Sequence, residues 1–265
     1  MKRLKAFATL IALATMAAVS GIAGATTSTT DYSDQWWNAS EPGWGASMLQ
    51  QRDVIFVDLF VYGADGKSTW FVAAVYRQAG AADTFVGDLY ATTGPGFALP
   101  TFDPAQVVGT KVGTLTFAAQ DATSATLSYT VNTSTVVKQI TRQTWAINQL
   151  SGTYLGGFPG VLDFCGALNG PKVETGTIVV TQTDTTLRVV SNTNVRGCTL
   201  TGNYVQSGRM GKSIGTFICS EPGGTLSGHY IMSEIEASVS GMGMKVSQVY
   251  TAGCVYDGRI GGVRQ

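Results

Sequence analysis

Four acidic residues in the first half of the chain are candidates for hydrolytic chemistry: Glu41, Asp53, Asp58 and Asp88. Paired carboxylates cut glycosidic bonds when one of them is buried enough to keep its proton. The spacing along the chain does not place any two of them across one cleft. A secreted hydrolase acting on a glycan or an ester therefore stays an alternative hypothesis.

A second candidate for chemistry is the run Gly211-Lys212-Ser213-Ile214-Gly215, which matches G-x-S-x-G. In hydrolases this motif lies on a strand-to-helix elbow, and a later histidine activates the serine. No helical pattern follows here, and the only histidine, His229, lies in a strand-like run. A strand or turn is therefore favoured over an elbow. One histidine cannot build a metal site alone, so we predict no metal and no cofactor.

The most informative segment alternates in the manner of a β-strand. Between residues 54 and 62, Ile55, Val57, Leu59 and Val61 alternate with Phe56, Asp58, Phe60 and Tyr62. A period of two with β-branched and aromatic residues predicts a strand. Gly63-Ala64-Asp65-Gly66 and a second apolar run from Ser68 to Arg77 follow, which together predict a hairpin.

The turn of this hairpin decides which side chains share a face. A three-residue loop with a G1 bulge pairs Phe60 with Trp70, Asp58 with Val72 and Phe56 with Ala74. A two-residue Asp-Gly turn would shift the register by one residue and move Trp70 to the aliphatic side. We favour the bulged form because it separates aromatic from aliphatic residues better.

One face of the hairpin then carries what we call the aromatic strip, which consists of Phe56, Phe60, Tyr62, Trp70 and Tyr76 around Asp58. Such a face can stack sugar rings or hold a peptide or an apolar ligand. Alternatively, it is the interior of a second sheet or barrel, with Asp58 hydrogen-bonded at its rim. The candidate ligand-binding residues are Phe56, Asp58, Phe60, Tyr62, Trp70 and Trp44.

The rest of the chain repeats the strand pattern and indicates an all-β fold. Further predicted strands are 47–51, 84–92, 111–119, 125–132, 135–147, 152–156, 175–182, 186–191, 198–206, 213–219, 225–234, 237–239 and 245–250. Short strands with turns between them predict an antiparallel meander that forms a small barrel or sandwich. All five tryptophans precede residue 148, whereas all four cysteines follow it. This shift predicts a Trp-rich β module over 26–147 and a disulfide-bearing β module over 148–265.

The cysteines Cys165, Cys198, Cys219 and Cys254 allow three disulfide pairings. Zinc is the weaker alternative because no C-x-x-C pair exists. Two faint internal echoes suggest a duplication, since 150–154 resembles 226–230 and 197–209 resembles 253–259. If it is real, Cys198 and Cys254 occupy matching strands, which favours the pairs Cys198–Cys219 and Cys165–Cys254.

The first 25 residues predict a signal peptide. Lys2, Arg3 and Lys5 precede an apolar run over 6–19, and Ala23-Gly24-Ala25 supplies an A-x-A cleavage site. The run is too short for a bilayer span, so we expect a mature chain without a transmembrane segment in the periplasm or outside the cell. Of 17 basic residues, 14 would remain against 17 acidic ones, so the mature net charge would be −3. Nucleic acid is a poor partner for such a chain.

The front of the mature chain resembles a recurring module of secreted proteobacterial proteins. The matching residues are Trp37-Asn38 through Glu41 to Gly43-Trp44-Gly45, then Phe60, Tyr62, Gly66 and Trp70. They correspond to W-N-x-x-E-x-G-W-G and W/F-x-Y-x-x-x-G-x-x-x-W. Val108-Gly109-Thr110 or Val112-Gly113-Thr114 fits a later strand of that module. The resemblance implies a secreted β-rich module, and it implies no activity.

Together these patterns predict an exported, non-catalytic binding or cell-envelope-associated protein. A glycan, a peptide or an apolar small molecule would suit the aromatic strip. Besides the hydrolase, a structural or assembly component of the envelope stays a second alternative, which an exposed edge strand with uncovered apolar residues would favour.

Overall fold

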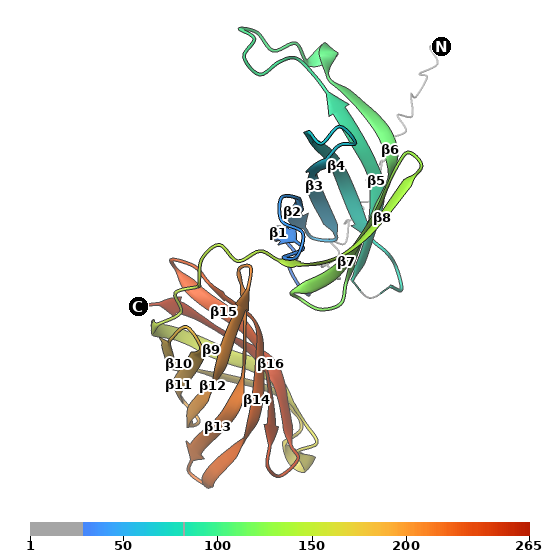
Figure 1. The fold of residues 1–265 in the computed structure, drawn as a ribbon. Coiled ribbons are helices and arrows are strands. Elements are labelled where there is room, and N and C mark those ends of the chain that lie inside the picture. Colours follow the sequence, from blue (N-terminus) through green and yellow to red (C-terminus); the bar gives the residue numbers. More distant parts are fainter. Residues whose placement is uncertain (1–28, 82) are drawn as a thin grey trace, which may run out of the picture.

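The computed structural model describes residues 29–81 and 83–265, and the predicted signal peptide lies outside them. The chain forms two closed antiparallel β-barrels of eight strands each, coloured blue to green and yellow to red in Figure 1. This confirms the predicted all-β antiparallel meander in two modules, and of the two predicted forms, a small barrel or a sandwich, both modules are barrels. Within the described ranges, no helix is long and apolar enough to cross a membrane.

The first barrel is an up-and-down meander in which each strand pairs with the next and β8 returns to β1. Its strands are β1 (Asp34–Trp37), β2 (Gly45–Gln51), β3 (Val54–Tyr62), β4 (Ser68–Arg77), β5 (Thr84–Thr93), β6 (Val108–Ala119), β7 (Ser124–Val131) and β8 (Ser134–Arg142). The short helix η1 (Pro104–Gln106) lies in the long β5–β6 loop. The strand predicted over 135–147 therefore ends five residues earlier, at Arg142.

The second barrel has the same topology and closes through β16 and β9. Its elements are β9 (Gly152–Asp163), η2 (Gly166–Leu168), β10 (Gly170–Gln182), β11 (Thr186–Thr193), β12 (Gly197–Ser207), β13 (Met210–Glu221), β14 (Gly224–Ala237), β15 (Gly241–Tyr250) and β16 (Val255–Arg264). The predicted boundary residue Asn148 lies in the segment 143–151 that joins the barrels.

Four strands differ from their predictions. β1 and β16 were not predicted, β9 runs seven residues beyond the predicted end at Gly156, and β14 runs to Ala237, the first residue of the separate strand predicted over 237–239. Glycine explains the errors in β9 and β16, because glycine is depleted in strands generally. Here it allows close packing of the two strands: a Cβ added to Gly156 would lie 1.9 Å from the carbonyl oxygen of Gly261.

The barrel interiors are filled by inward-facing side chains. In the first barrel, the rings of Tyr32, Trp36, Phe85 and Phe117 pack edge-on or tilted against one another, with centroids 5.2–6.2 Å apart. The second interior combines tyrosines such as Tyr154 and Tyr230 with aliphatic residues and methionines. The side chains of both cores are almost completely buried, so among the described residues a partner would meet the walls and ends of the barrels.

The disulfides are Cys198–Cys219 and Cys165–Cys254, and both lie in the second barrel. This confirms the favoured pairing. Cys198 and Cys219 face each other across β12 and β13. Cys165 and Cys254 tie the segment after β9 to the β15–β16 turn, which lies 89 residues further along the chain.

Polar contacts join the two barrels. Arg209 of the second barrel donates to the carboxylate of Asp31 and to the carbonyl oxygen of Ser33, and its backbone N–H donates to Asp34. Thr30 donates to Glu234, which also binds Lys245. The segment 29–34 therefore forms much of the joint between the barrels.

Candidate functional site

The aromatic strip lies on the outer wall of the first barrel, over β3 and β4. Ile55, Val57 and Leu59 face the interior and have no exposed surface, whereas the strip residues are 39–59% exposed. The alternative that placed the strip in an interior is therefore wrong. The closure of the barrel puts the aliphatic face inside, so the aromatic face can only point outward.

The predicted register of the hairpin is confirmed. Phe60 pairs with Trp70, Asp58 with Val72 and Phe56 with Ala74. Gly66 adopts a φ of 74°, the left-handed conformation that the bulged loop requires. This register places Phe60 and Trp70 opposite each other on neighbouring strands.

Two glycines lie beneath aromatic rings of the strip. A Cβ added to Gly45 would lie 2.8 Å from the ring of Phe60, and one added to Gly43 would lie 2.8 Å from the hydroxyl of Tyr62. The rings of Phe60 and Tyr62 therefore lie over backbone that carries no side chain. This covers the glycines and holds the two rings against the wall of the barrel.

Asp58 is a half-buried carboxylate in the middle of the strip, opposite Ser47 on one side and Val72 on the other. Among the described residues it has no hydrogen bond or ion pair. Its oxygens can therefore accept hydrogen bonds from a ligand that lies on the rings. This arrangement, aromatic area with a few polar groups, is typical of ligand sites.

A shallow hollow of about 340 Å³ continues the strip onto β5, and Ala74, Tyr76, Gly87, Asp88 and Tyr90 line it. Asp88 pairs with Lys111 at 2.8 Å. Tyr90 and Lys111 were not singled out in the sequence analysis. They join the strip only through the pairing of β4 with β5 and of β5 with β6, which no local pattern reveals.

Trp44, the sixth predicted ligand residue, is not part of the strip. It packs against the core of the first barrel, and its indole N–H donates to Glu41 at 3.1 Å. Glu41 also forms an ion pair with Lys138 at 2.7 Å. Of the four predicted acids, Glu41 and Asp88 are thus paired with lysines.

The G-x-S-x-G run lies in the first half of β13 and makes no elbow. Ser213 faces the interior of the second barrel, where its hydroxyl is 2.9 Å from the hydroxyl of Tyr230. His229 lies on β14 and is exposed, paired with Thr216. The serine and the histidine are therefore on opposite sides of the barrel wall and cannot act together.

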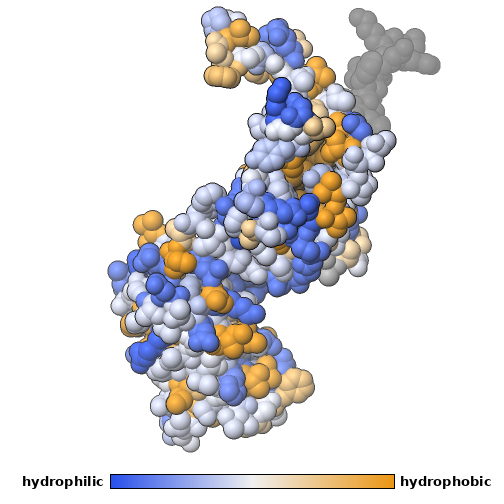
Figure 2. Space-filling view, viewed as in Figure 1, coloured by the Kyte–Doolittle hydropathy of each residue, from blue (hydrophilic) through white to orange (hydrophobic). Residues whose placement is uncertain are grey.

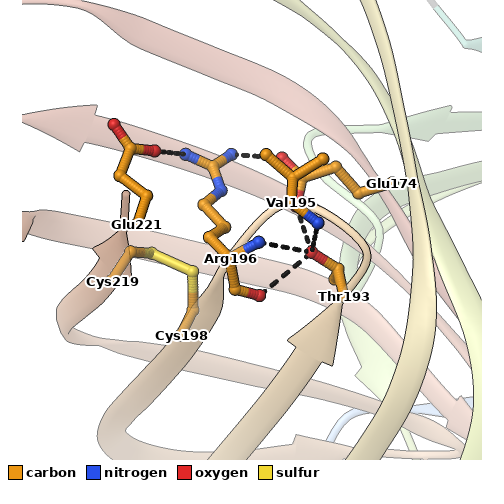
Figure 3. Close-up of a disulfide and its surroundings, with 7 residues drawn as sticks. All are labelled: Glu174, Thr193, Val195, Arg196, Cys198, Cys219 and Glu221. Atoms are coloured by element: carbon orange, nitrogen blue, oxygen red, sulfur yellow. Dashed lines mark hydrogen bonds and ion pairs between the residues drawn. A yellow bond between two sulfur atoms is a disulfide. The ribbon is translucent and has the colours of Figure 1, made fainter. Parts of the chain in front are cut away.

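The second barrel has two further groups of charged residues. Figure 3 shows Arg196 between Glu174 and Glu221, at 2.7 and 4.0 Å, beside the Cys198–Cys219 disulfide. The adjoining cavity of about 20 Å³ is too small for a substrate. Both carboxylates are held by one guanidinium, so this cluster is best explained as a buried ion-pair network.

Another hollow, of about 440 Å³, lies at the end of the second barrel nearest the joint, where Arg209 and Glu236 line it. Burial raises the pKa of Glu236 above its usual value. Arg209 lies 3.6 Å from Glu236 and also binds Asp31. The guanidinium serves the joint between the barrels, and no aromatic ring lines this hollow.

A second apolar feature is the β5–β6 loop, whose Phe97, Leu99 and Phe102 are exposed. Figure 2 shows apolar side chains at the tip of this loop, which projects from the first barrel. Asp103, the carboxylate that follows Phe102, accepts hydrogen bonds from Ala105 and Gln106 within the loop, unlike the unpaired Asp58 of the strip.

No family model matches the chain, and no curated protein matches it.

Proposed function

We propose that this chain is an exported, non-catalytic binding protein that holds a glycan against the outer wall of the first barrel. The observation that carries the proposal is the aromatic strip, which lies uncovered on β3 and β4 around the unpaired Asp58. Aromatic faces stack on the apolar faces of sugar rings, and carboxylates accept hydrogen bonds from sugar hydroxyls.

The proposal that the chain is exported is supported by its N-terminal sequence and by its cysteines. The predicted signal peptide and two disulfides both fit an oxidising compartment such as the periplasm or the medium. Cell fractionation with an antibody to the mature chain tests this. Protein found only in the cytoplasm would contradict it.

A glycan suits the strip better than a purely apolar ligand does. The wall is open and has no deep pocket, whereas small apolar ligands bind where most of their surface is buried. The strip runs along two strands, from Phe56 to Tyr62 and from Trp70 to Tyr76. That is about 20 Å at the usual rise per residue, so an elongated ligand fits it.

The test is affinity electrophoresis of the mature chain in gels that contain soluble β-glucan, xylan, mannan or polygalacturonate. Trp70→Ala should weaken binding about tenfold, since one lost ring contact is worth about 1 kcal/mol or slightly more. Trp145→Ala is the matched control, because Trp145 is exposed but lies in the joining segment. An equal loss in both variants would argue against the strip.

The same experiment addresses the hydrolase alternative. Reducing ends released during incubation with the polysaccharides would show catalysis and overturn the non-catalytic part of the proposal. Binding without release supports a binding protein. Failure of all four polysaccharides to retard the chain would overturn the glycan as the ligand.

A further inference from the structure

The hollow beside the strip differs from the rest of the wall because its floor is made of small residues. Ala74 faces outward between two tyrosines, and Gly87 lies next to it on β5. Gly87 cannot carry a side chain here, since a Cβ would lie 2.1 Å from the carbonyl oxygen of Ala74. The depression is therefore built into the packing of β4 against β5.

Aromatic rings stand at both ends of this floor. Tyr76 lies opposite Val86, and Tyr90 lies opposite Val72. The two tyrosines are therefore offset by four residues along the strand direction. This corresponds to about 14 Å along the sheet at the usual rise per residue. Ala74 is also paired with Phe56. The hollow is thus bounded by aromatic residues on three sides and opens onto the strip.

One wall of the hollow offers a paired acceptor and donor. The Asp88 carboxylate and the Lys111 ammonium lie 2.8 Å apart, and their side chains are 43% and 55% exposed. A surface ion pair of this kind contributes little to stability. Both groups keep free hydrogen-bonding capacity toward solvent, so they can bind two neighbouring hydroxyls, one as acceptor and one as donor.

The charge of this region restricts the ligand. Asp58 and Asp88 carry two negative charges, and Lys111 supplies one positive charge close to Tyr90. The net charge of −1 disfavours a uronate or a sulfated sugar, because like charges repel at short range. The volume of the hollow is at the lower end of the range for small-molecule sites.

We propose that the hollow between Tyr76 and Tyr90 is a subsite for one pyranose ring of an uncharged glycan. Tyr76 and Tyr90 flank the ring, Ala74 leaves room for it, and Asp88 with Lys111 binds neighbouring hydroxyls. This inference rests on the proposed function, since it assigns part of the same ligand to a defined place on the wall.

The most direct variant is Ala74→Leu, which fills the hollow and leaves every aromatic and charged residue in place. Ala74 is exposed, so the added methyl groups point to solvent and the barrel should still fold. We expect at least a tenfold loss of affinity for β-glucan by isothermal titration. Tyr90→Ala and the double variant Asp88→Asn, Lys111→Met should each weaken binding about tenfold.

The controls match these changes in chemistry. Lys212→Met removes an exposed lysine of the second barrel, and Trp145→Ala removes an exposed ring from the joining segment. Both should bind like the unchanged chain. Thermal melting by circular dichroism should show the same transition for every variant, which separates lost binding from lost folding.

The outcomes separate the two proposals. If Trp70→Ala weakens binding of β-glucan but Ala74→Leu and Tyr90→Ala do not, the subsite is overturned and the proposed function stands. If polygalacturonate binds more tightly than β-glucan, the inference that the glycan is uncharged is wrong. If the unchanged chain binds none of the polysaccharides, or if Trp70→Ala binds them as tightly as the unchanged chain does, both proposals are overturned.

Discussion

The first barrel closes through a short seam, whereas the second closes along almost a full strand. β1 pairs with β8 only at Trp36–Arg142 and Trp37–Thr141. β16 pairs with β9 from Val255–Asp163 to Arg264–Tyr154. The second barrel also has both disulfides. The same eight-stranded architecture is therefore stabilised in two different ways.

In the first barrel, a buried arginine strengthens the short seam between β1 and β8. The Arg142 side chain is fully buried and pairs with Asp34 at 3.0 Å. It donates to three backbone carbonyls, and its guanidinium lies 4.9 Å from the centre of the Trp36 ring. A buried charge is tolerated when all its donors are satisfied. Here it joins β8, β1 and the segment before β1.

The outer walls differ as well. Exposed apolar side chains on the strands of the second barrel are aliphatic, for example Val205, Ile214 and Ile218. On β3 and β4 of the first barrel they are mostly aromatic. Single exposed apolar side chains are common on protein surfaces, whereas a contiguous exposed patch such as the aromatic strip is typical of an interaction site.

The largest effect should come from removing the Cys165–Cys254 disulfide by changing both residues to serine. The cross-link closes a loop with a sequence separation of 89. Its loss should lower the free energy of unfolding of the second barrel by about 4.5 kcal/mol, because the unfolded chain gains entropy. Urea unfolding followed by circular dichroism measures this. Tryptophan emission should hardly change, since no tryptophan lies beyond residue 145.

The next largest loss of stability is expected at the seam between β1 and β8 of the first barrel. Arg142→Ala should destabilise this barrel by about 4 kcal/mol, since Asp34 would lose the partner of a buried ion pair. Urea unfolding followed by tryptophan emission reports it, because Trp36 lies against the arginine. Arg188→Ala, which removes an exposed arginine of the second barrel, is the control. A change of less than 1 kcal/mol, on the order of a surface substitution, would refute the role of Arg142.

A smaller loss of stability is expected in acid at the joint between the two barrels. Burial opposes ionisation of Asp31, but hydrogen bonds from Ser33 and the charge of Arg209 together lower its pKa below the usual 3.8. Its contribution is therefore complete above pH 3.8 and is lost as the pH falls below that value. With half of the side chain exposed, it amounts to about 0.5–1 kcal/mol.

Small-angle scattering from pH 7 to pH 3 tests this contact. The unchanged chain should keep one radius of gyration down to pH 3.8 and expand only below it, as Asp31 takes up a proton. Asp31→Asn should be expanded already at pH 7, whereas Asp184→Asn, in an exposed turn, should behave like the unchanged chain. Burial of Glu236 acts with the opposite sign, because its raised pKa favours the folded state in acid. Expansion that starts near neutral pH would contradict a role for Asp31.

The smallest effect on stability is expected in the aromatic strip. Trp70→Ala should change the free energy of unfolding by less than about 1 kcal/mol, since the ring is 55% exposed. Phe117→Ala, which removes a fully buried ring of the same barrel, should cost about 3–5 kcal/mol. Urea unfolding of both variants measures the difference. If the two losses were equal, the strip would be a structural element rather than a surface for binding.

Several parts of the site could be predicted because they are local. The alternation in β3 and the loop around Gly66 determine the register of the hairpin, and this register places Phe60 beside Trp70. The predicted ligand residue Trp44 lies outside the strip, partly buried against the core of the first barrel. It comes from a loop, so no period along the chain indicates whether its ring points to the core or to solvent.

The hollow could not be predicted, because its parts come from three strands. Tyr76, Asp88 and Lys111 are brought together by the pairing of β4 with β5 and by a register shift between β5 and β6 at Leu89 and Tyr90. Such a shift leaves no clear mark in a sequence rich in threonine and glycine. Lys111 would otherwise follow the inward positions of β6 and could not reach Asp88.

The sequence by itself determined the all-β class, the segregation of tryptophans from cysteines and the two faces of the first hairpin. These features depend on side-chain alternation and on composition, which act over a few residues. Only the tertiary structure decided which face is covered. Closure of the barrel buries one side of every strand, so the aliphatic face became the core and the aromatic strip with Asp58 was left open to a ligand.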